Sequence, residues 1–286
     1  MEKIKIAIIG GSGIYDIEGV EDVTTLDIDT PFGKPSDKII RGTLAGVRFA
    51  FLPRHGRGHK ISPSELNFRA NIYALKSIGV EQILSISAVG SLKQELKPRD
   101  FVVPDQLFDY TKGRPCTFFS EGIVAHVGIA DPFCPDLSRI AYDTIKDLGI
   151  TVHKGGTYVC IEGPQFSTKA ESNAYRKIGF SIIGMTAMPE AKLAREAEIC
   201  YTTIALVTDY DVWKEDEEVT LEKVLANLSA NTENAKKFIK SILPKLDRGL
   251  KCNCQTALAT AIVTSPDAMP AKTKQKLNLL IKKYIK

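Results

Sequence analysis

The chain has 286 residues, of which 44% are hydrophobic and 25% charged, so it has the composition of an ordinary globular protein with material for one large core. No apolar run approaches the ~18 residues that cross a bilayer. No small-residue cleavage site follows the short apolar run near Met1, so we expect a cytoplasmic protein without a signal peptide or membrane span.

Strand-like and helical segments alternate along the chain. Apolar runs typical of strands buried on both faces cover residues 4–9, 48–52, 82–87, 100–103, 151–161, 181–185 and 199–207. Helical periodicity with boundary residues predicts helices over residues 67–77, 136–148, 167–177 and 221–243. This alternation predicts a single α/β domain in which helices flank a central sheet.

The C-terminal segment differs in charge from the rest of the chain. From Lys236 onward, 12 Lys and Arg stand against two acids, a balance of +10 that leaves −6 for the remainder. Near the end lies a helical apolar stripe of Leu277, Leu280, Ile281, Tyr284 and Ile285. We predict a main domain over residues 1–265 and a basic amphipathic tail over residues 266–286. Such a tail could attract nucleic acid or a membrane, but a solvated basic helix is the simpler interpretation, and we expect neither partner.

Two loops at strand ends carry groups that bind anions. After the first strand, GGSG offers backbone N–H groups and the Ser12 hydroxyl. It lacks the dinucleotide spacing and a P-loop lysine, so a plain turn is equally compatible. The run PRHGRGH at residues 53–59 places Arg54, whose planar fork matches phosphate oxygens, beside His55 as a further donor. We interpret this second loop as an anion site rather than a solvated basic loop.

Three further strand ends carry small, hydroxyl-bearing or aromatic residues. Ser87 and Ala88 follow a buried strand, where small residues permit close backbone contact with a ligand. Phe166 stands at a strand–helix junction, where its ring could stack on a flat base. Thr186 ends another strand before a helix. The alternatives are a tight turn for the first block, which is the more common explanation of such a run on its own, a helix cap for the second and a plain helix entry for the third.

A pair of acids closes the run at residues 199–207. A buried carboxylate in such a place can have a raised pKa and donate a proton to a leaving group, which makes Asp209 and Asp211 candidates for acid catalysis. A solvated acidic turn is the alternative. Two acids without a nearby Asn or Gly make a poor calcium or magnesium cage.

The six cysteines have no metal-ligand spacing. Only Cys252 and Cys254 are close in sequence, and no second pair completes a four-ligand site, so we predict no metal site. We expect reduced thiols in a mesophile cytosol, whereas a hyperthermophilic source would permit intracellular disulfides.

Eight short blocks, in their order and spacing, resemble the 5′-methylthioadenosine phosphorylases of the purine nucleoside phosphorylase superfamily. The blocks are GGSGIY, TPFGKPSD, PRHGRGH, SAVGS, ADPFCP, IEGPQFST, GMTAMPE and TDYDVW, and they cover about residues 4–255. The resemblance implies a mixed central sheet and a trimer or a dimer of trimers. It implies phosphorolysis of 5′-methylthioadenosine to adenine and 5-methylthioribose 1-phosphate, in purine and methionine salvage. Inorganic phosphate is then the co-substrate, and no metal or organic cofactor is expected.

The resemblance also implies a role for each candidate residue. It places phosphate against Ser12, Arg54, His55, Ser87, Ala88 and Thr186. It places the nucleoside against Phe166, Ser167, Met185, Asp209, Asp211, Leu221, Val224 and Leu225, with His126 of a neighbouring subunit over the 5′ group. In catalysis a protonated Asp209 would neutralise the purine at N7, while Arg54 and His55 orient phosphate below C1′. The Cys252-Asn253-Cys254 run matches a disulfide motif of thermophilic members.

Two features favour 5′-methylthioadenosine over other nucleosides. Asp209 and Asp211 can accept from a 6-amino group, whereas members acting on 6-oxopurines carry Asn at the first position. The apolar Leu221 suits a methylthio group, although one lost apolar contact, worth ~1–3 kcal/mol, would not exclude adenosine. The alternatives are a broader phosphorylase of adenosine, inosine or guanosine, a hydrolytic nucleosidase, and a non-enzymatic binding module that uses the basic tail.

Overall fold

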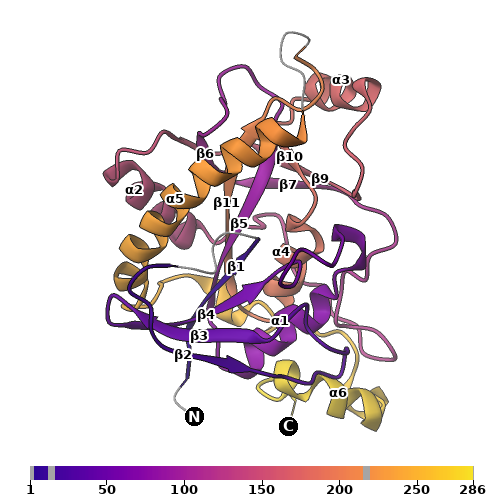
Figure 1. Ribbon diagram of the computed structural model, residues 1–286. Helices are drawn as coiled ribbons and strands as arrows, with labels where there is room; N and C mark the ends of the chain where they lie inside the picture. Colours follow the sequence, from indigo (N-terminus) through magenta and orange to yellow (C-terminus); the bar gives the residue numbers. More distant parts are fainter. Residues whose placement is uncertain (1–2, 12–16, 215–219, 286) are drawn as a thin grey trace.

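An 11-stranded mixed sheet forms the centre of the computed structural model, which describes residues 3–11, 17–214 and 220–285 (Figure 1). Its strands are β1 (Ile6–Gly10), β2 (Glu21–Leu26), β3 (Ile39–Leu44), β4 (Val47–Pro53), β5 (Gln82–Ser91), β6 (Phe101–Val103), β7 (Gln106–Tyr110), β8 (Val152–Lys154), β9 (Thr157–Ile161), β10 (Ile182–Gly184) and β11 (Cys200–Asp209). They follow the order β2-β3-β4-β1-β5-β10-β9-β7, and a branch from β5 continues through β11 and β6 to β8.

The middle of the sheet is parallel. β1 pairs in parallel with β4 and with β5, and β5 pairs in parallel with β11. The carboxyl ends of these four strands therefore meet at one edge, which is where open α/β sheets bind ligands. Arg54 directly after β4, Ser87 in β5 and Asp209 at the end of β11 lie toward this edge.

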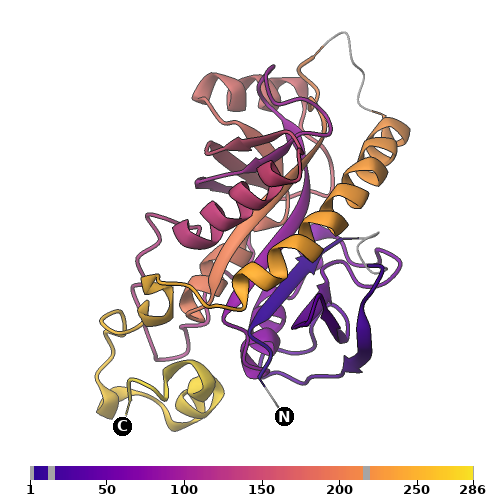
Figure 2. The same ribbon diagram turned by 90° about the vertical axis from the view of Figure 1, so that its left-hand side faces the viewer.

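Helices cover both faces of the sheet, as Figures 1 and 2 show together. They are α1 (Phe68–Ser77), α2 (Pro135–Asp147), α3 (Lys169–Ile178), α4 (Ala187–Glu196), α5 (Leu221–Leu246) and α6 (Ala271–Ile281), with short 3-10 turns η1 (Pro63–Glu65), η2 (Asn253–Thr256) and η3 (Pro266–Ala268). In β1, Ile6 and Ile8 join the apolar cluster of α2 and α5, while Ala7 and Ile9 join that of α1, α4 and α6. The continuous apolar run at residues 4–9 thus reflects burial on both faces, as predicted.

Local sequence signals place the helix ends. Pro135 occupies the first turn of α2, where a missing N–H costs no hydrogen bond. Thr168 caps α3 by accepting from the N–H of Glu171, whose carboxylate accepts in return from the N–H of Thr168. The prediction of a helix at residues 167–177 is confirmed with its start two residues later.

The structure differs from the predicted elements in two ways. The run at residues 151–161 is two strands, β8 and β9, which separate at Gly155-Gly156 and join different branches of the sheet. The strands β2, β3 and β7 were not predicted. β2 and β7 are largely exposed, so they lack the continuous apolar run that marks a buried strand.

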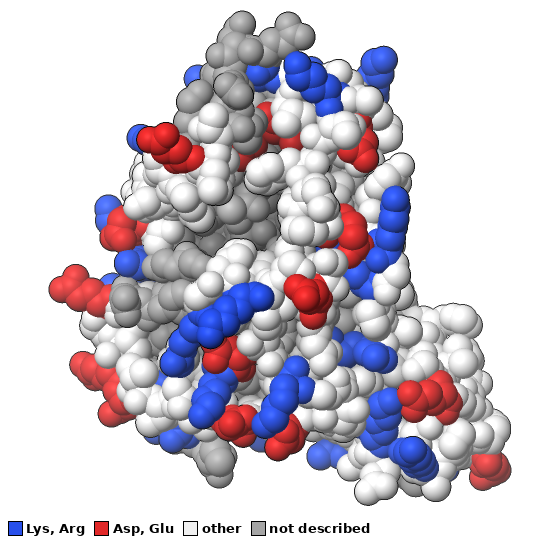
Figure 3. Space-filling view, turned by 45° about the vertical axis from the view of Figure 1, so that its right-hand side comes forward, with Lys and Arg blue, Asp and Glu red and all other residues white. Residues whose placement is uncertain are grey.

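The C-terminal segment packs against the same core as α1. Leu277 and Leu280 of α6 lie in the apolar cluster that contains Leu75, and the Glu198 carboxylate accepts hydrogen bonds from Tyr284 and Lys283. On the face in Figure 3, Lys and Arg are interspersed with Asp and Glu and form no continuous basic expanse. None of the described helices combines the length and apolar character needed to cross a membrane. The division of the chain at residue 265 stays a prediction.

Replacing Leu277 by Ala tests how firmly α6 belongs to the core. Leu277 is fully buried, so L277A should lower the free energy of unfolding by about 2–5 kcal/mol in urea titrations. The matched control is L148A at the partly exposed end of α2, which should cost less than about 1 kcal/mol. Equal, small effects of the two substitutions would mean that α6 is an independent appendage.

Candidate active site

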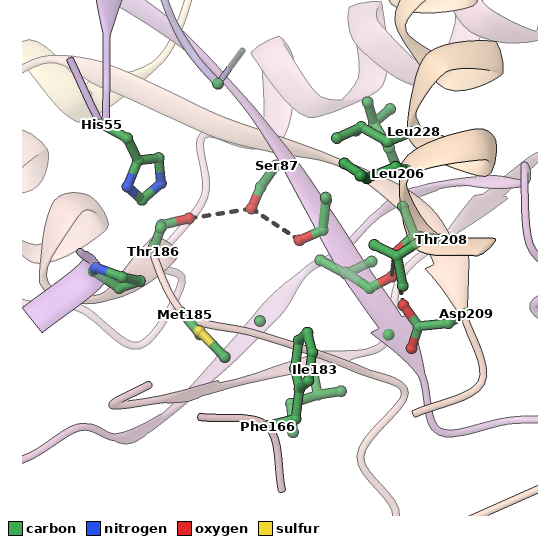
Figure 4. A pocket seen from close by; sticks show the side chains of 18 of the residues that line it. His55, Ser87, Phe166, Ile183, Met185, Thr186, Leu206, Thr208, Asp209 and Leu228 are labelled. Carbon is green, nitrogen blue, oxygen red and sulfur yellow. Dashed lines mark hydrogen bonds between the residues drawn. The ribbon is translucent and has the colours of Figure 1, made fainter. Parts of the chain in front are cut away.

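A cavity of about 550 Å³ opens at the carboxyl edge of the parallel strands, a size suited to a small-molecule ligand. Its walls come from the loop after β4, the ends of β5, β10 and β11, the loop before α3, and the first turns of α5. Figure 4 shows that His55, Ser87 and Thr186 gather at one side and Asp209 at another, with Met185 and Phe166 along the rim between them. The cavity therefore has two chemically different ends.

Hydroxyl groups mark the first end. Ser87 of β5 and Thr186 before α4 are both buried, and their oxygens lie 3.1 Å apart. Thr186 occupies the N-cap position of α4 without making a side-chain capping bond. Its hydroxyl is hydrogen-bonded to that of Ser87 instead, and the pair lies beside the positive end of a helix, where an anion is favoured.

Arg54 is held firmly beneath this end. The guanidinium is only 2% exposed. Its Nε and Nη2 donate to the two carboxylate oxygens of Glu190 at 3.0 and 3.1 Å, and Nη2 also donates to Ser85 Oγ at 2.7 Å. Nη1 donates to the carbonyl of Ile86 at 2.9 Å, so one Nη1 hydrogen of the five in the fork has no partner among the described residues.

Glu190 is the main residue of this end that sequence reasoning missed. It is fully buried and also accepts hydrogen bonds from Ser85 and Tyr201, both at 2.8 Å. The carboxylate balances the charge of Arg54 and fixes its plane. Glu190 lies in the GMTAMPE block, but nothing in its spacing from Arg54 predicts the pair, because the two residues are 136 positions apart.

His55 is neutral and has a defined tautomer. Nδ1 lies 2.8 Å from the carbonyl oxygen of Ile61, which can only accept, so Nδ1 carries the hydrogen. Burial, with a contribution from the neighbouring Arg54, lowers the pKa of His55 to about 4. Nε2 is therefore an acceptor at neutral pH, which differs from the donor expected from the sequence.

Two acids mark the second end. Asp209 Oδ2 accepts from the Thr208 hydroxyl at 2.7 Å, and Oδ1 accepts from the N–H of Asp211 at 2.8 Å. Burial raises the pKa of Asp209 above its ordinary value, and burial likewise raises the pKa of Asp211. The raised pKa expected for a carboxylate at this strand end is confirmed in direction.

A glycine permits this arrangement. A Cβ at Gly90 of β5 would lie 3.0 Å from Asp209 Oδ1 and 3.0 Å from the Ile183 side chain. Any larger residue would push the carboxylate away from the strand. The close approach of Asp209 in β11 thus explains why the SAVGS block has a glycine at position 90.

Helix α5 is tied to the strand that carries Asp209. Asn227 donates to the carbonyl of Thr208 at 2.8 Å, and Asn231 donates to that of Val207 at 2.9 Å. The first turns of α5 bring Leu221, Val224 and Leu225 to the cavity. Leu221 and Leu225 are exposed to 68% and 53%, so the wall that they form is open on its outer side.

Buried polar groups set the floor near Met185. Arg114 donates from Nη1 to the carbonyls of Met185 and Met188 at 2.8 and 2.7 Å, and from Nε to Glu162 at 2.9 Å. A Cβ at Gly184 would lie 2.0 Å from Tyr158 Oη, so a glycine is required there. Sequence reasoning gave no role to Arg114 or Tyr158, because neither stands in a recognisable block.

The structure brings most of the predicted site residues to one cavity. Those that line it are Arg54, His55, Ser87, Ala88, Phe166, Ser167, Met185, Thr186, Asp209, Asp211, Leu221, Val224 and Leu225. Ser12 lies outside the described residues, although Gly11 lines the cavity. His126 is exposed and does not line it. The Ser167 Oγ is buried and has no hydrogen-bond partner among the described residues, which leaves it available to a ligand.

The lowered pKa of His55 predicts a pH dependence of stability. The unfolded chain takes up this proton below pH about 6.5 and the folded chain only near pH 4, so the unfolded state binds more protons between these values. The free energy of unfolding should therefore fall by about 2 kcal/mol from pH 7.5 to pH 5 through this residue. H55N, which keeps a donor toward Ile61, should remove that part of the fall in urea titrations.

The matched control is H126Q, which removes an exposed histidine away from the cavity. An unchanged pH dependence in H55N would mean that His55 is not held neutral by burial.

Comparison with known proteins agrees with this geometry. A family model described as the phosphorylase superfamily matches residues 5–244. The S-methyl-5′-thioadenosine phosphorylase of Koribacter versatilis is 55% identical over 281 residues, 98% of this chain and 96% of the relative. That of Geobacter sulfurreducens is 52% identical over 287 residues, 100% of both chains.

Solved structures match over almost the whole chain as well. A crystal structure of methylthioadenosine phosphorylase from an antarctic soil metagenomic library has a TM-score of 0.94 and 50% identity, covering 98% of this chain and 99% of that one. Methylthioadenosine phosphorylase from Schistosoma mansoni, in complex with adenine, has a TM-score of 0.81 and 34% identity, with 98% of each chain covered. The expected α/β fold with a mixed central sheet is confirmed. The chain belongs to the phosphorylase superfamily and, within it, to the S-methyl-5′-thioadenosine phosphorylases.

Proposed function

We propose that this chain cleaves 5′-methylthioadenosine with inorganic phosphate, releasing adenine and 5-methylthioribose 1-phosphate. The observation that carries the proposal is a single cavity with a hydroxyl-lined end at Ser87 and Thr186 and a buried carboxyl group at Asp209. Parallel pairing of β5 and β11 brings Ser87 and Asp209 to the same edge of the sheet. Such a cavity suits a reaction that joins an anion to one side of a sugar while a base leaves from the other.

The proposed reaction breaks the bond from C1′ to the purine and forms a bond from C1′ to phosphate. As the bond between C1′ and N9 breaks, its electron pair moves into the purine and C1′ gains positive charge. Asp209 in its acid form gives its proton to N7, so adenine leaves neutral. A phosphate oxygen then forms the new bond to C1′. The chain contributes positioning and electrostatic stabilisation, and no cofactor is needed for these steps.

The neutral His55 suggests how phosphate is held. Hydrogen phosphate carries one P–OH group, which can donate to His55 Nε2. The remaining Nη1 hydrogen of Arg54 and the hydroxyls of Ser87 and Thr186 can donate to the other oxygens. The charge of Arg54 is already balanced by Glu190, so binding relies on directed hydrogen bonds more than on net positive charge. Ser12 and the backbone at Ala88 complete the set that we propose.

The wall of the cavity supports a purine with an apolar 5′ group. Ser167 Oγ, Asp209 and Asp211 offer polar contacts to a base edge, and Phe166 lies at the same rim (Figure 4). Leu221, Val224 and Leu225 form an apolar surface toward which a methylthio group could point. These contacts favour 5′-methylthioadenosine over a broader set of nucleosides.

We further propose a homotrimer or a dimer of trimers, working in the cytoplasm in purine and methionine salvage. Phe166 and Leu221 are exposed to 59% and 68% although they line the cavity, so the cavity mouth has an uncovered apolar rim. His126 is exposed and lies away from the cavity of its own chain. Both features suit an arrangement in which His126 of a neighbouring subunit covers the 5′ group.

The direct test is adenine release from 5′-methylthioadenosine with and without inorganic phosphate. We expect release that requires phosphate and yields a sugar 1-phosphate, measured by chromatography of both products. Equal release in the absence of phosphate would identify a hydrolase instead. Inosine turned over as fast as 5′-methylthioadenosine would favour the broader purine nucleoside phosphorylase.

Replacing Asp209 tests its role as the acid. D209N keeps the size but has no proton to transfer, so kcat should fall by about 10²–10⁴-fold. The raised pKa means that the wild-type acid form is lost only as pH rises through that raised value, so wild-type kcat should decline on the alkaline side. D209N should lack this decline.

The matched control is D143N, an exposed acid on α2 paired with Arg139, which should keep wild-type kcat and its pH profile. If D209N kept more than about a tenth of wild-type kcat, acid catalysis by Asp209 would be ruled out.

A further inference from the structure

Four cysteines from distant parts of the chain meet at the end of β11 that is opposite to the cavity. The Sγ atoms of Cys134, Cys200, Cys252 and Cys254 all lie within 4.8 Å of one another. Cys134 is the N-cap residue of α2, Cys200 begins β11, and the other two flank the start of η2. Three are buried and Cys252 is partly buried. The remaining cysteines, Cys116 and Cys160, are not in this cluster.

We propose that this cluster is a structural site for a thiophilic divalent metal ion, with Zn²⁺ as the expected occupant. A tetrahedral ion with metal–sulfur distances near 2.3 Å requires sulfurs about 3.8 Å apart. The observed separations, 3.2 Å between Cys200 and Cys252 and none above 4.8 Å, need adjustments of about 1 Å or less to reach that geometry. Each sulfur has all three others as neighbours. A tetrahedral ion needs this arrangement, whereas two separate disulfide pairs would not need it.

The surroundings suit bound thiolates. Four thiolates and one divalent cation leave two negative charges, which burial would penalise without compensation. Arg195 places Nη1 3.6 Å from Cys254 Sγ, and Cys134 lies at the positive end of α2. The nearby Glu198 carboxylate does not compete for the ion, since Leu258 N–H, Tyr284 and Lys283 already donate to it.

The site would hold the fold together rather than take part in the reaction. Four protein sulfurs leave no open coordination position for a substrate. Cys200 and Asp209 are the first and last residues of β11, so about 30 Å of strand separates the ion from the acid. Cys252 and Cys254 lie between α5 and α6, so an ion would fasten this connection to the starts of α2 and β11.

The spacing of the cysteines along the chain led to the prediction that there is no metal site. Cys252 and Cys254 are one close pair, while Cys134 and Cys200 are 66 positions apart and form no recognisable motif. Only the fold brings the single cysteines to the pair. In the structure all six cysteines are free thiols, and the Cys252–Cys254 disulfide implied by the resemblance is not formed.

The test is the metal content of the full-length reduced protein. After expression in zinc-supplemented medium and purification with a non-thiol reductant, we expect about one zinc per chain by mass spectrometry of metals. C252S, at the partly exposed ligand, should lose most of this zinc, whereas C116S, at an exposed cysteine outside the cluster, should keep it. Exchange for Co²⁺ should give sulfur-to-cobalt charge-transfer bands in wild type and in C116S but not in C252S.

Two results would overturn the proposal. One is reduced, folded wild-type protein that binds neither Zn²⁺ nor Co²⁺. The other is a pair of intrachain disulfides among the four cysteines, found by peptide mass spectrometry without reduction, in protein that takes up no zinc after reduction. Chelation provides a second readout, because it should lower the Tm of wild type and leave that of C252S unchanged. Below its Tm, zinc-free wild type should keep its kcat, so failure of this site is distinguishable from failure of the proposed function.

Discussion

The parallel pairing of β5 with β11 is the constraint on which the rest of the molecule depends. It runs in register from Gln82 beside Cys200 to Val89 beside Val207, with both strands almost wholly buried. Between Val207 and Asp209 the register shifts by one residue, so that Asp209 stands opposite Gly90. An irregularity of this kind redirects a side chain at the end of a strand. Here the register shift places the Asp209 carboxyl group over Gly90, which has no side chain to displace it.

Buried arginines fix the loops around the cavity. Arg54 and Arg114 each use a carboxylate and backbone carbonyls as acceptors, Arg54 with Glu190 and Arg114 with Glu162. A buried charge is costly unless it is paired and hydrogen-bonded, and each of these two guanidiniums has a carboxylate partner and backbone acceptors. Each guanidinium therefore joins segments far apart in sequence in one geometry. The positions of Met185 and of the loop after β4 follow from these bonds.

The two ends of the cavity show how the same burial acts oppositely on acids and bases. Burial disfavours the charged form of any group, so it raises the pKa of Asp209 and lowers the pKa of His55. One group is thereby biased toward holding a proton that it could give to a leaving base. The other is held neutral, and its Nε2 has no hydrogen-bond partner in the part of the chain that the structure describes. Both conditions suit a site that handles an anion and a leaving purine at neutral pH.

The sequence by itself determined the α/β class, the buried central strands and the polar loops at their ends. It could do so because a strand that is buried on both faces has a continuous apolar run. Helix-capping residues are also adjacent to the helix that they cap, so the sequence shows them directly. It also indicated that Arg54, Ser87, Thr186 and Asp209 belong together, through blocks whose order resembles a family. It did not reveal the exposed strands β2 and β7, whose residues alternate too weakly to mark them.

Only the tertiary structure decided the contacts between distant residues. The Arg54–Glu190 pair spans 136 positions, and the cysteine cluster gathers single residues with no motif between them. The acceptor state of His55 depends on a backbone carbonyl and on burial, neither of which a sequence displays. Such features arise from packing, which brings together groups whose spacing along the chain carries no information about their distance in space.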